Sequence, residues 1–425
     1  MKLNVKRTVL VGLAFMTISG FWQLYDFMIP LILKDVFKVS DTISGVVMAL
    51  DNILALFLMP LFGSVSDKVS TKFGKRMPFI VIGTIITTFS MLLIPTAAVQ
   101  KSLIMFIVGL GIILVALAIY RSPAVALMPD VTLKPLRSKG NAIINLLGAV
   151  GGVIVLLIVA NLGPSETRGY FPSFVATALF MLIPILIMMF TIKENAWASE
   201  MSDLSEQYGI TEEEAEITTE TQAMKPEVKK SLVFLLLAIA FWFMGYNAVI
   251  SAFSRYASHQ IGLTTSQAAN ILTVANVGAI VSFIPIGQIS SKIGRKKMIQ
   301  IGVIVLTLAF FTSTFYQKFS PLMFVNFIAA GFGWAAINVN SLPMVLEMAK
   351  GSETGQYTGL YYTFSMTAQV ATPILSGLLF DLIGYQVLFP YASFFVVLSF
   401  VMIFFVKHGD SKLQDYEEMN IEDVF

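Results

Sequence analysis

The sequence predicts an all-α integral membrane protein whose twelve transmembrane helices form two pseudo-symmetric six-helix bundles. Its composition points to a membrane, because 56% of the 425 residues are hydrophobic and only 13% are charged, against about 25% charged residues in an ordinary soluble domain. The apolar residues gather in long runs, and one polar stretch divides these runs into two groups of six. Two short polar loops with related sequences stand at matching places in the two groups, which indicates an internal duplication.

Each apolar run has the length that a membrane helix needs, which is about 20 residues. Backbone inside a bilayer must satisfy its own hydrogen bonds, so we expect every run to be a helix. The predicted spans are 8–31, 42–62, 78–98, 102–128, 139–162, 170–192, 231–254, 267–289, 298–317, 320–346, 355–379 and 386–406.

The basic residues of the short loops predict the orientation. They cluster before the first span and after the second, fourth and eighth spans, whereas the loops of the other side hold single basic residues. We therefore expect the clustered side, and both termini, to be cytoplasmic. The predicted parts are an N-terminal bundle 1–192, a cytoplasmic linker 193–230, a C-terminal bundle 231–406 and a cytoplasmic tail 407–425. The polar linker is expected to be a solvated tether with short helices, with a regulatory docking segment as the alternative.

The most informative motif lies between the second and third spans. It reads Gly63-Ser-Val-Ser-Asp67-Lys68-Val-Ser-Thr-Lys72-Phe-Gly74-Lys75-Arg76, and a degenerate copy reads Gly287-Gln-Ile-Ser-Ser291-Lys292-Ile-Gly294-Arg295-Lys296-Lys297. The first loop resembles the signature of major facilitator superfamily transporters, in which a Gly and an Asp are followed by a Gly and basic residues. The resemblance implies the major facilitator fold, with two parallel halves built from inverted helix triplets.

A narrower resemblance rests on the stretched form of the first loop, where Lys-Phe-Gly-Lys-Arg is followed at once by a Pro-Phe-Ile segment. This form is similar to the glycoside–cation symporters and the sucrose–proton symporters. The sucrose carriers have an arginine where this chain has Val125, and Arg121 stands one helical turn earlier. Melibiose-type carriers have cation-site aspartates where this chain has Ala55 and Met59, with Asp51 one turn away. These departures favour a proton over sodium as the coupling ion.

The resemblance assigns a gating role to the signature loop. Its candidate residues are Gly63, Asp67, Gly74, Lys75 and Arg76. Asp67 is expected at the start of the eleventh helix near Thr354, where a carboxylate interacts favourably with the helix dipole. The basic pair is expected to bind carboxylates or lipid phosphates, or only to set the topology. Ser291 replaces the aspartate in the second copy, so gating by the two halves should be asymmetric.

Three ionisable residues lie inside predicted spans, namely Asp26, Asp51 and Arg121. Charges in a bilayer are costly and face cavities, pair with one another or take part in transport. Burial favours the neutral form of a carboxyl group, and a nearby cation favours the charged form. A carboxylate that meets Arg121 in only one conformation would therefore exchange protons with each cycle. We expect this of either Asp26 or Asp51. The alternatives are a buried structural pair or, for Asp26, a position shallow enough to reach the outer water.

Aromatic and neutral polar side chains suggest a substrate that is rich in hydroxyl groups. In the first span, Trp22 and Gln23 stand near Asp26, an arrangement suited to the C–H faces and hydroxyls of a sugar. In the second half the candidates are Asn338, Tyr362 and Gln369, which lie on polar helix faces. Packing of Trp22 on a neighbouring helix, and interhelical hydrogen bonds for the others, are the alternatives.

The expected function is secondary active transport by alternating access, with uptake of a sugar or glycoside together with a proton. A proton-coupled exporter of drugs or metabolites is the alternative, and a membrane sensor is a weaker one. We expect no enzymatic activity, no cofactor other than the coupling ion, no metal site and no nucleic-acid partner. The protein is expected to be a monomer in the plasma membrane, with the lipid bilayer and a small molecule as its partners.

Overall fold

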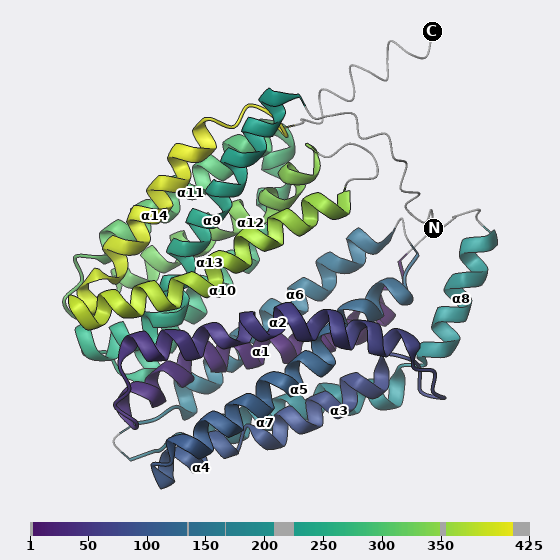
Figure 1. Cartoon of the computed structure of the whole chain (residues 1–425), viewed down its shortest axis with the longest axis horizontal. Helices are drawn as coiled ribbons and strands as arrows, with labels where there is room; N and C mark the ends of the chain where they lie inside the picture. Colours follow the sequence, from purple (N-terminus) through teal and green to yellow (C-terminus); the bar gives the residue numbers. More distant parts are fainter. Residues whose placement is uncertain (1–2, 134–135, 166, 208–224, 349–353, 411–425) are drawn as a thin grey trace. The chain divides into compact units, whose positions relative to one another are not determined.

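The computed structural model describes residues 3–133, 136–165, 167–207, 225–348 and 354–410. Within these ranges, twelve helices are long and apolar enough to cross a membrane, which confirms the predicted spans (Figure 1). Several helices extend beyond the predicted bounds by a turn or more because their polar ends continue the helix past the apolar segment. The acidic part of the predicted linker, 208–224, and the tail from 411 onward lie outside the described residues.

The helices of the first half pack in two groups, one on α1 and one on α3. They are α1 Val5–Asp35, α2 Asp41–Lys68, α3 Met77–Ser90, α4 Leu93–Gln100, α5 Leu103–Asp130, α6 Arg137–Leu162 and α7 Phe171–Thr191, followed by α8 Glu194–Gln207. Helix α1 packs on α5, α6 and α7, and α3 packs on α5 and α7. The third span is broken into α3 and α4 just before Pro95, whose missing N–H and ring disfavour a continuous helix.

The second half repeats this plan. Its helices are α9 Pro226–Arg255, which continues into a π-helical turn Tyr256–Gln260, then α10 Thr265–Ile293, α11 Arg295–Ser313, α12 Leu322–Leu346, α13 Thr354–Leu382 and α14 Leu388–Phe404. Helix α11 packs on α12 and α14, and α9 packs on α13 and α14. The core of this half is mainly aliphatic and aromatic, with buried serine and threonine side chains and the fully buried Arg255 among them.

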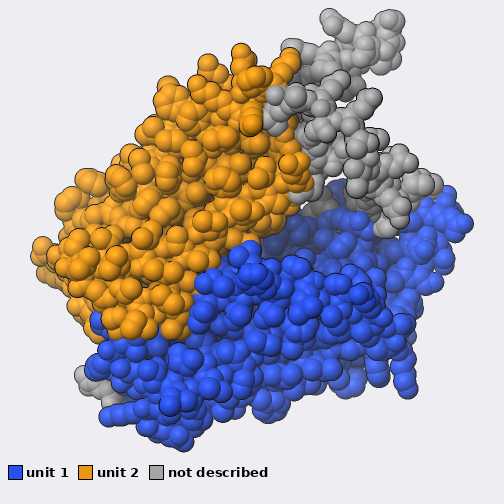
Figure 2. All heavy atoms as spheres, in the orientation of Figure 1, with its two compact units in different colours: residues 1–39, 50–212, 264–270 blue, residues 40–49, 213–263, 271–425 orange. Residues whose placement is uncertain are grey.

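The chain divides into two compact units, shown in separate colours in Figure 2. Unit 1 comprises residues 1–39, 50–212 and 264–270, and unit 2 comprises 40–49, 213–263 and 271–425. Helix α2 thus begins in unit 2 and continues in unit 1, and α10 begins in unit 1 and continues in unit 2. The predicted bundles, 1–192 and 231–406, contain no such exchange.

Candidate functional site

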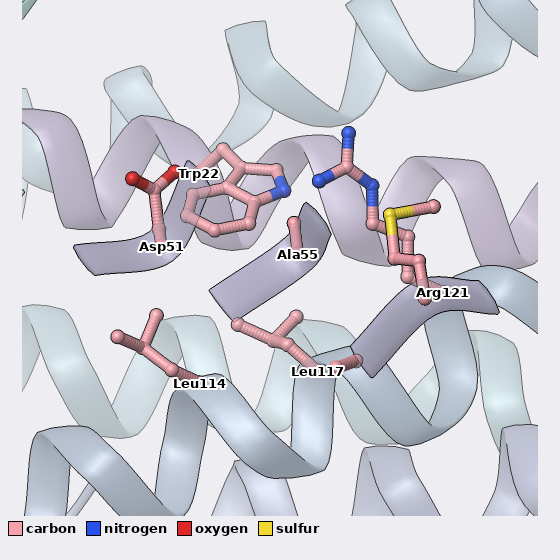
Figure 3. A pocket seen from close by; sticks show the side chains of 8 residues that line it. Trp22, Asp51, Ala55, Leu114, Leu117 and Arg121 are labelled. Carbon is pink, nitrogen blue, oxygen red and sulfur yellow. The ribbon is translucent and has the colours of Figure 1, made fainter. Parts of the chain in front are cut away.

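A small pocket in the interior of unit 1 collects three of the predicted site residues. It lies among α1, α2 and α5 (Figure 3). Its lining residues are Trp22, Asp51, Ala55, Met59, Leu114, Leu117, Ala118 and Arg121. Most of these side chains are apolar, so the carboxylate, the guanidinium and the indole are the groups that can bind a polar ligand here.

The charged residues of this pocket interact with each other and with the indole. The Arg121 guanidinium lies 5.7 Å from the centre of the Trp22 ring, a distance at which a cation is attracted to an aromatic face. Asp51 interacts electrostatically with Arg121, and it accepts a hydrogen bond of 2.9 Å from the side chain of Asn52. The Trp22 Nε1 donor is buried without a hydrogen-bond partner in the described part of the chain. The pocket can therefore offer an anion, a cation, an aromatic face and a donor to a small ligand.

Asp26 belongs to the same electrostatic group although it does not line the pocket. Its carboxyl group interacts with that of Asp51, and both interact with the buried phenol of Tyr25. Two carboxyl groups that repel each other are easier to keep together when one of them holds a proton. The structure thus brings Asp26 and Asp51 together, as a candidate proton site requires.

Gln23 does not line the pocket, although the sequence predicts that it acts together with Trp22 and Asp26. A β-carbon placed on Gly152 of α6 would lie 3.0 Å from the Gln23 side chain, and one on Gly148 would lie 2.8 Å from the hydroxyl of Ser19. Ser19 and Gln23 therefore pack against the glycine face of α6, while Trp22 turns to the pocket. Small residues allow such close helix contact, so this face of α1 serves packing at least in part.

The signature loop forms an ion cluster at the end of α2 in unit 1. The buried Arg76 side chain contacts Asp67 and Ser66, and its Nε donates to Asp130 at 2.9 Å. The Lys75 amine lies 3.4 Å from the same Asp130 carboxylate. Burial alone would lower the pKa of Arg76, but the hydrogen bonds and charges of Asp130 and Asp67 outweigh it and raise that pKa above its ordinary value. Arg76 is therefore a permanent cation that holds two helix ends together.

A second carboxylate, Glu194, organises the start of α3. This buried side chain accepts hydrogen bonds from the backbone N–H groups of Lys75, Arg76 and Met77 at 2.8–3.1 Å. It thereby satisfies donors that a helix start leaves unpaired, and its charge suits the positive end of the helix dipole. Gly74 has a φ of +112°, and a β-carbon there would overlap Glu194. The glycine of the motif is thus required by the carboxylate that follows the sixth span.

The second copy of the loop repeats this clamp with different residues. Gly294 has a φ of +96°, and Asp410 accepts a hydrogen bond of 3.0 Å from the backbone N–H of Lys296. Arg295 pairs with Glu347 at the end of α12. Sequence reasoning identified both loops but missed Glu194, Asp130 and Asp410. For two of them the sequence does contain a signal, because Glu194 and Asp410 are carboxylates that each follow the last helix of their half.

The candidates in unit 2 are spread along α12 and α13. Asn338 and Tyr362 are exposed, whereas the Gln369 amide donates to the carbonyl of Ser365 at 3.3 Å. Tyr361, which sequence reasoning passed over, is buried, and its hydroxyl lies 3.1 Å from that of Ser341. Tyr361 thus forms a bond between α12 and α13, whereas Asn338 and Tyr362 have exposed side chains.

An aromatic cluster also lies in unit 2, between α9 and α12. The rings of Tyr246 and Trp334 are stacked 3.6 Å apart at an angle of 3°, and Phe243 meets Trp334 edge-on. The Asn247 amide nitrogen next to this stack is buried without a hydrogen-bond partner in the described residues. Across these same residues, no group of three His, Asp or Glu side chains could hold a metal ion.

A family model matches most of the chain. The model of the Major Facilitator Superfamily matches residues 11–269 and 235–420. Among solved structures, the xylose transporter XylE of Escherichia coli is similar in fold, with a TM-score of 0.68 and 12% identity over 96% of this chain and 97% of that one.

Two relatives carry names that refer to different compounds. Multidrug resistance protein 2 of Bacillus subtilis is 27% identical over 88% of this chain and 90% of its own length. Sucrose transport protein SUC4 of Arabidopsis thaliana is 32% identical, but over 23% of this chain and 22% of its own length. The likeness to the multidrug resistance protein is thus broad, and the likeness to the sucrose transport protein is local.

Proposed function

The chain belongs to the major facilitator superfamily, and from this premise we propose that it takes up a sugar or glycoside together with a proton by alternating access. Membership confirms the superfamily that the signature loop resembles; the sugar-symporter branch, the coupling ion and the direction are part of the proposal. We further propose that the protein is not an enzyme and works as a monomer in the plasma membrane, with both termini in the cytoplasm.

The observation that carries the proposal is the group formed by Asp26, Asp51, Arg121 and Trp22. Apolar surroundings favour a protonated carboxyl group, and a nearby guanidinium favours the charged form. A movement of Arg121 toward or away from Asp51 would therefore release or admit a proton. Because Arg121 also lies over Trp22, a ligand that occupies the indole face would displace the cation and alter the protonation of Asp51. Substrate binding and proton binding would then be coupled at one place.

The neutral groups of unit 2 support a hydroxyl-rich substrate. Accessible amide and phenol groups at Asn338 and Tyr362, and the stacked rings of Tyr246 and Trp334, are the kinds of groups that hold a sugar through hydrogen bonds and ring contacts. The local similarity to a sucrose transport protein agrees with this choice. Most ligand pockets likewise combine apolar walls with a few oriented polar groups.

Export of an organic cation is the second candidate, and one observation favours it. The Trp22 ring already holds a cation, the Arg121 guanidinium, beside the Asp51 carboxylate in an otherwise apolar pocket. A planar or lipophilic cation could replace the guanidinium with the same contacts. The broad similarity to a multidrug resistance protein agrees with this alternative.

The test uses proteoliposomes and solid-supported-membrane currents. Xylose, sucrose and a β-glucoside form one panel, and ethidium and tetraphenylphosphonium form the other. Sugar-evoked inward positive current that grows at acid pH without sodium would establish sugar–proton symport. Silence with the sugars and a response to the cations would overturn it in favour of the second candidate.

Two variants test the proton site in the same assay. Asp51→Asn and Asp26→Asn should abolish or strongly reduce the pH dependence of the current, because a neutral amide does not exchange protons. Asn52→Ala removes a hydrogen bond to Asp51 but no ionisable group, so the current of this variant should stay pH-dependent with a shifted midpoint. The proton assignment fails if both Asp variants transport with an unchanged pH profile.

A further inference from the structure

Two donor groups in the pocket of unit 1 face each other. The indole nitrogen of Trp22 is buried without a hydrogen-bond partner in the described part of the chain. Figure 3 shows this nitrogen on the side of the ring that points toward the Arg121 guanidinium, whereas the Asp51 carboxylate lies at the opposite end of the ring. An indole N–H can only donate, and every nitrogen of a guanidinium is a donor as well. The two groups cannot bond to each other, so an acceptor between them would satisfy the indole.

A carboxylate is the acceptor that suits these donors best. Its two oxygens only accept when they are ionised, and a guanidinium presents its N–H groups in a fork that matches them. Hydrogen bonds that involve charged groups are about twice as strong as neutral ones. A sugar hydroxyl can also accept from Trp22, but its bond to Arg121 lacks the second charge. The pocket therefore favours a ligand that carries a carboxylate.

The other lining residues define the rest of this ligand. Ala55, Met59, Leu114 and Leu117 are apolar, so they can contact carbon but cannot bond to hydroxyl groups. The Trp22 ring offers its face to the C–H groups of a sugar ring. A sugar acid fits this arrangement, with its carboxylate between the two donors and a C–H face against the walls.

The charge balance of the pocket links such a ligand to a proton. The titratable or charged groups that face Asp51 are Asp26 and Tyr25 on α1 and Arg121 on α5. When one of the two aspartates holds a proton, the other balances the charge of Arg121. The carboxylate of a ligand would then add an uncompensated negative charge, which is strongly unfavourable in the interior. Protonation of the second aspartate removes this excess, so Arg121 exchanges one carboxylate partner for another at constant total charge.

We propose that the pocket binds the carboxylate of a sugar acid, which pairs with Arg121 and the Trp22 indole while Asp51 takes up a proton. Such a substrate presupposes the sugar–proton symport proposed above and narrows its class to sugars that carry a carboxylate. A sugar anion that enters with one proton moves no net charge, whereas a neutral sugar with one proton moves a positive charge. The two classes of substrate therefore differ in the current that they produce.

Binding of D-glucuronate and D-glucuronamide tests the carboxylate directly, because the two ligands share a sugar ring and differ in one charged or neutral group. Calorimetric titration in two buffers of different ionisation enthalpy gives both the affinity and the proton uptake. Glucuronate should bind more tightly than the amide by on the order of 100-fold. Its affinity should rise by about tenfold for each pH unit of acidification, as uptake of one proton requires while Asp51 is ionised. Equal affinities without proton uptake would overturn the proposal.

Variants of the pocket should separate its groups. Arg121→Gln should weaken glucuronate binding by on the order of 100-fold and leave the amide nearly unaffected, and Arg121→Lys should fall between, because it keeps the charge without the fork. Trp22→Phe keeps a ring but loses the donor and should cost about tenfold. Asp51→Asn should bind glucuronate without proton uptake. Arg168→Gln, at an exposed arginine of the same unit, is the control. Unchanged glucuronate affinity in both Arg121 variants would overturn the site.

Proteoliposomes distinguish failure of the sugar-acid site from failure of symport. An inward glucuronate gradient should acidify the lumen, as trapped pyranine reports, without a current. Acidification and an inward positive current with glucose or sucrose, and neither with glucuronate, would overturn the sugar-acid site and leave symport standing. A response to ethidium, with no proton movement on addition of any sugar or sugar acid, would overturn both.

Discussion

Both copies of the signature loop use a carboxylate to hold the start of the following helix, but the first copy contains more charged contacts than the second. In unit 1, Arg76 joins Asp67 and Asp130, and Glu194 accepts three backbone N–H groups of α3. In unit 2, Ser291 stands where Asp67 would be, and Asp410 accepts the N–H of Lys296. Both copies keep a positive-φ glycine beside the capping carboxylate. The comparison teaches that the glycine and the clamp form the shared scaffold of the duplication, whereas the acidic residue after the first glycine is specific to unit 1.

The largest effect that would break this comparison is expected at Gly74. Gly74→Ala should destabilise the protein by about 4 kcal/mol, because a left-handed backbone is strained for alanine and the new β-carbon overlaps Glu194, which adds the cost of overpacking. Gly294→Ala should cost less, about 2 kcal/mol, because the atoms it meets are the far end of the Asp410 side chain, at 2.8–2.9 Å. Thermal unfolding in detergent measures both.

The double variant separates strain from overlap. If Glu194 causes part of the effect, the losses from Gly74→Ala and Glu194→Ala should add to more than the loss in the double variant. Equal losses for Gly74→Ala and Gly294→Ala would show that the two clamps are equally tight, against the structure.

An intermediate effect is expected when the clamps themselves are removed. Glu194→Ala leaves three backbone N–H groups without their acceptor and should cost about 3 kcal/mol, whereas Asp410→Ala should cost about 1 kcal/mol. The shift in Tm, measured in the same detergent, should therefore be clearly larger for unit 1. The interpretation is wrong if Asp410→Ala is the more damaging variant.

The smallest effect on stability is expected at the position that differs between the copies. Asp67 is 59% exposed, and a solvent-exposed ion pair contributes about 0.2–1 kcal/mol. Asp67→Asn should therefore change Tm very little, while the transport rate should change, as the expected gating role of this loop requires. Ser291→Asp should make the second copy resemble the first and shift the rate as well. Unchanged rates for both variants would remove Asp67 from the gate.

The contact of Asp67 with the start of the eleventh helix stays a prediction. The structure shows that Asp67 meets Arg76 within unit 1. Arg76 remains charged throughout the ordinary pH range, because its pKa is raised above the usual value for arginine. Its contribution to the stability of the fold is therefore fully present at every pH below that usual value. A pH dependence of transport must therefore arise elsewhere, which keeps Asp26 and Asp51 as its expected source.

The sequence by itself determined the features that follow from local composition. Twelve spans, the internal duplication, the two motif loops and the intramembrane charges Asp26, Asp51 and Arg121 could all be read from it, because a bilayer forces apolar runs to be helices and makes each charge conspicuous. Helical periodicity likewise predicted candidate residues near Trp22, since residues one or two turns apart share a helix face.

Only the tertiary structure decided which of these residues meet. It turned Trp22 toward Asp51 and Arg121 but placed Gln23 on the glycines of α6. It supplied Asp130, Glu194 and Asp410 as partners of the loops, and it enclosed Arg255 with Asp41 and Tyr385. These pairings join residues from about 50 to more than 300 positions apart, and the rotation of one helix against another depends on packing that periodicity cannot specify. The physical reason is that a helix fixes its own faces locally, whereas the neighbour of each face is set by the whole assembly.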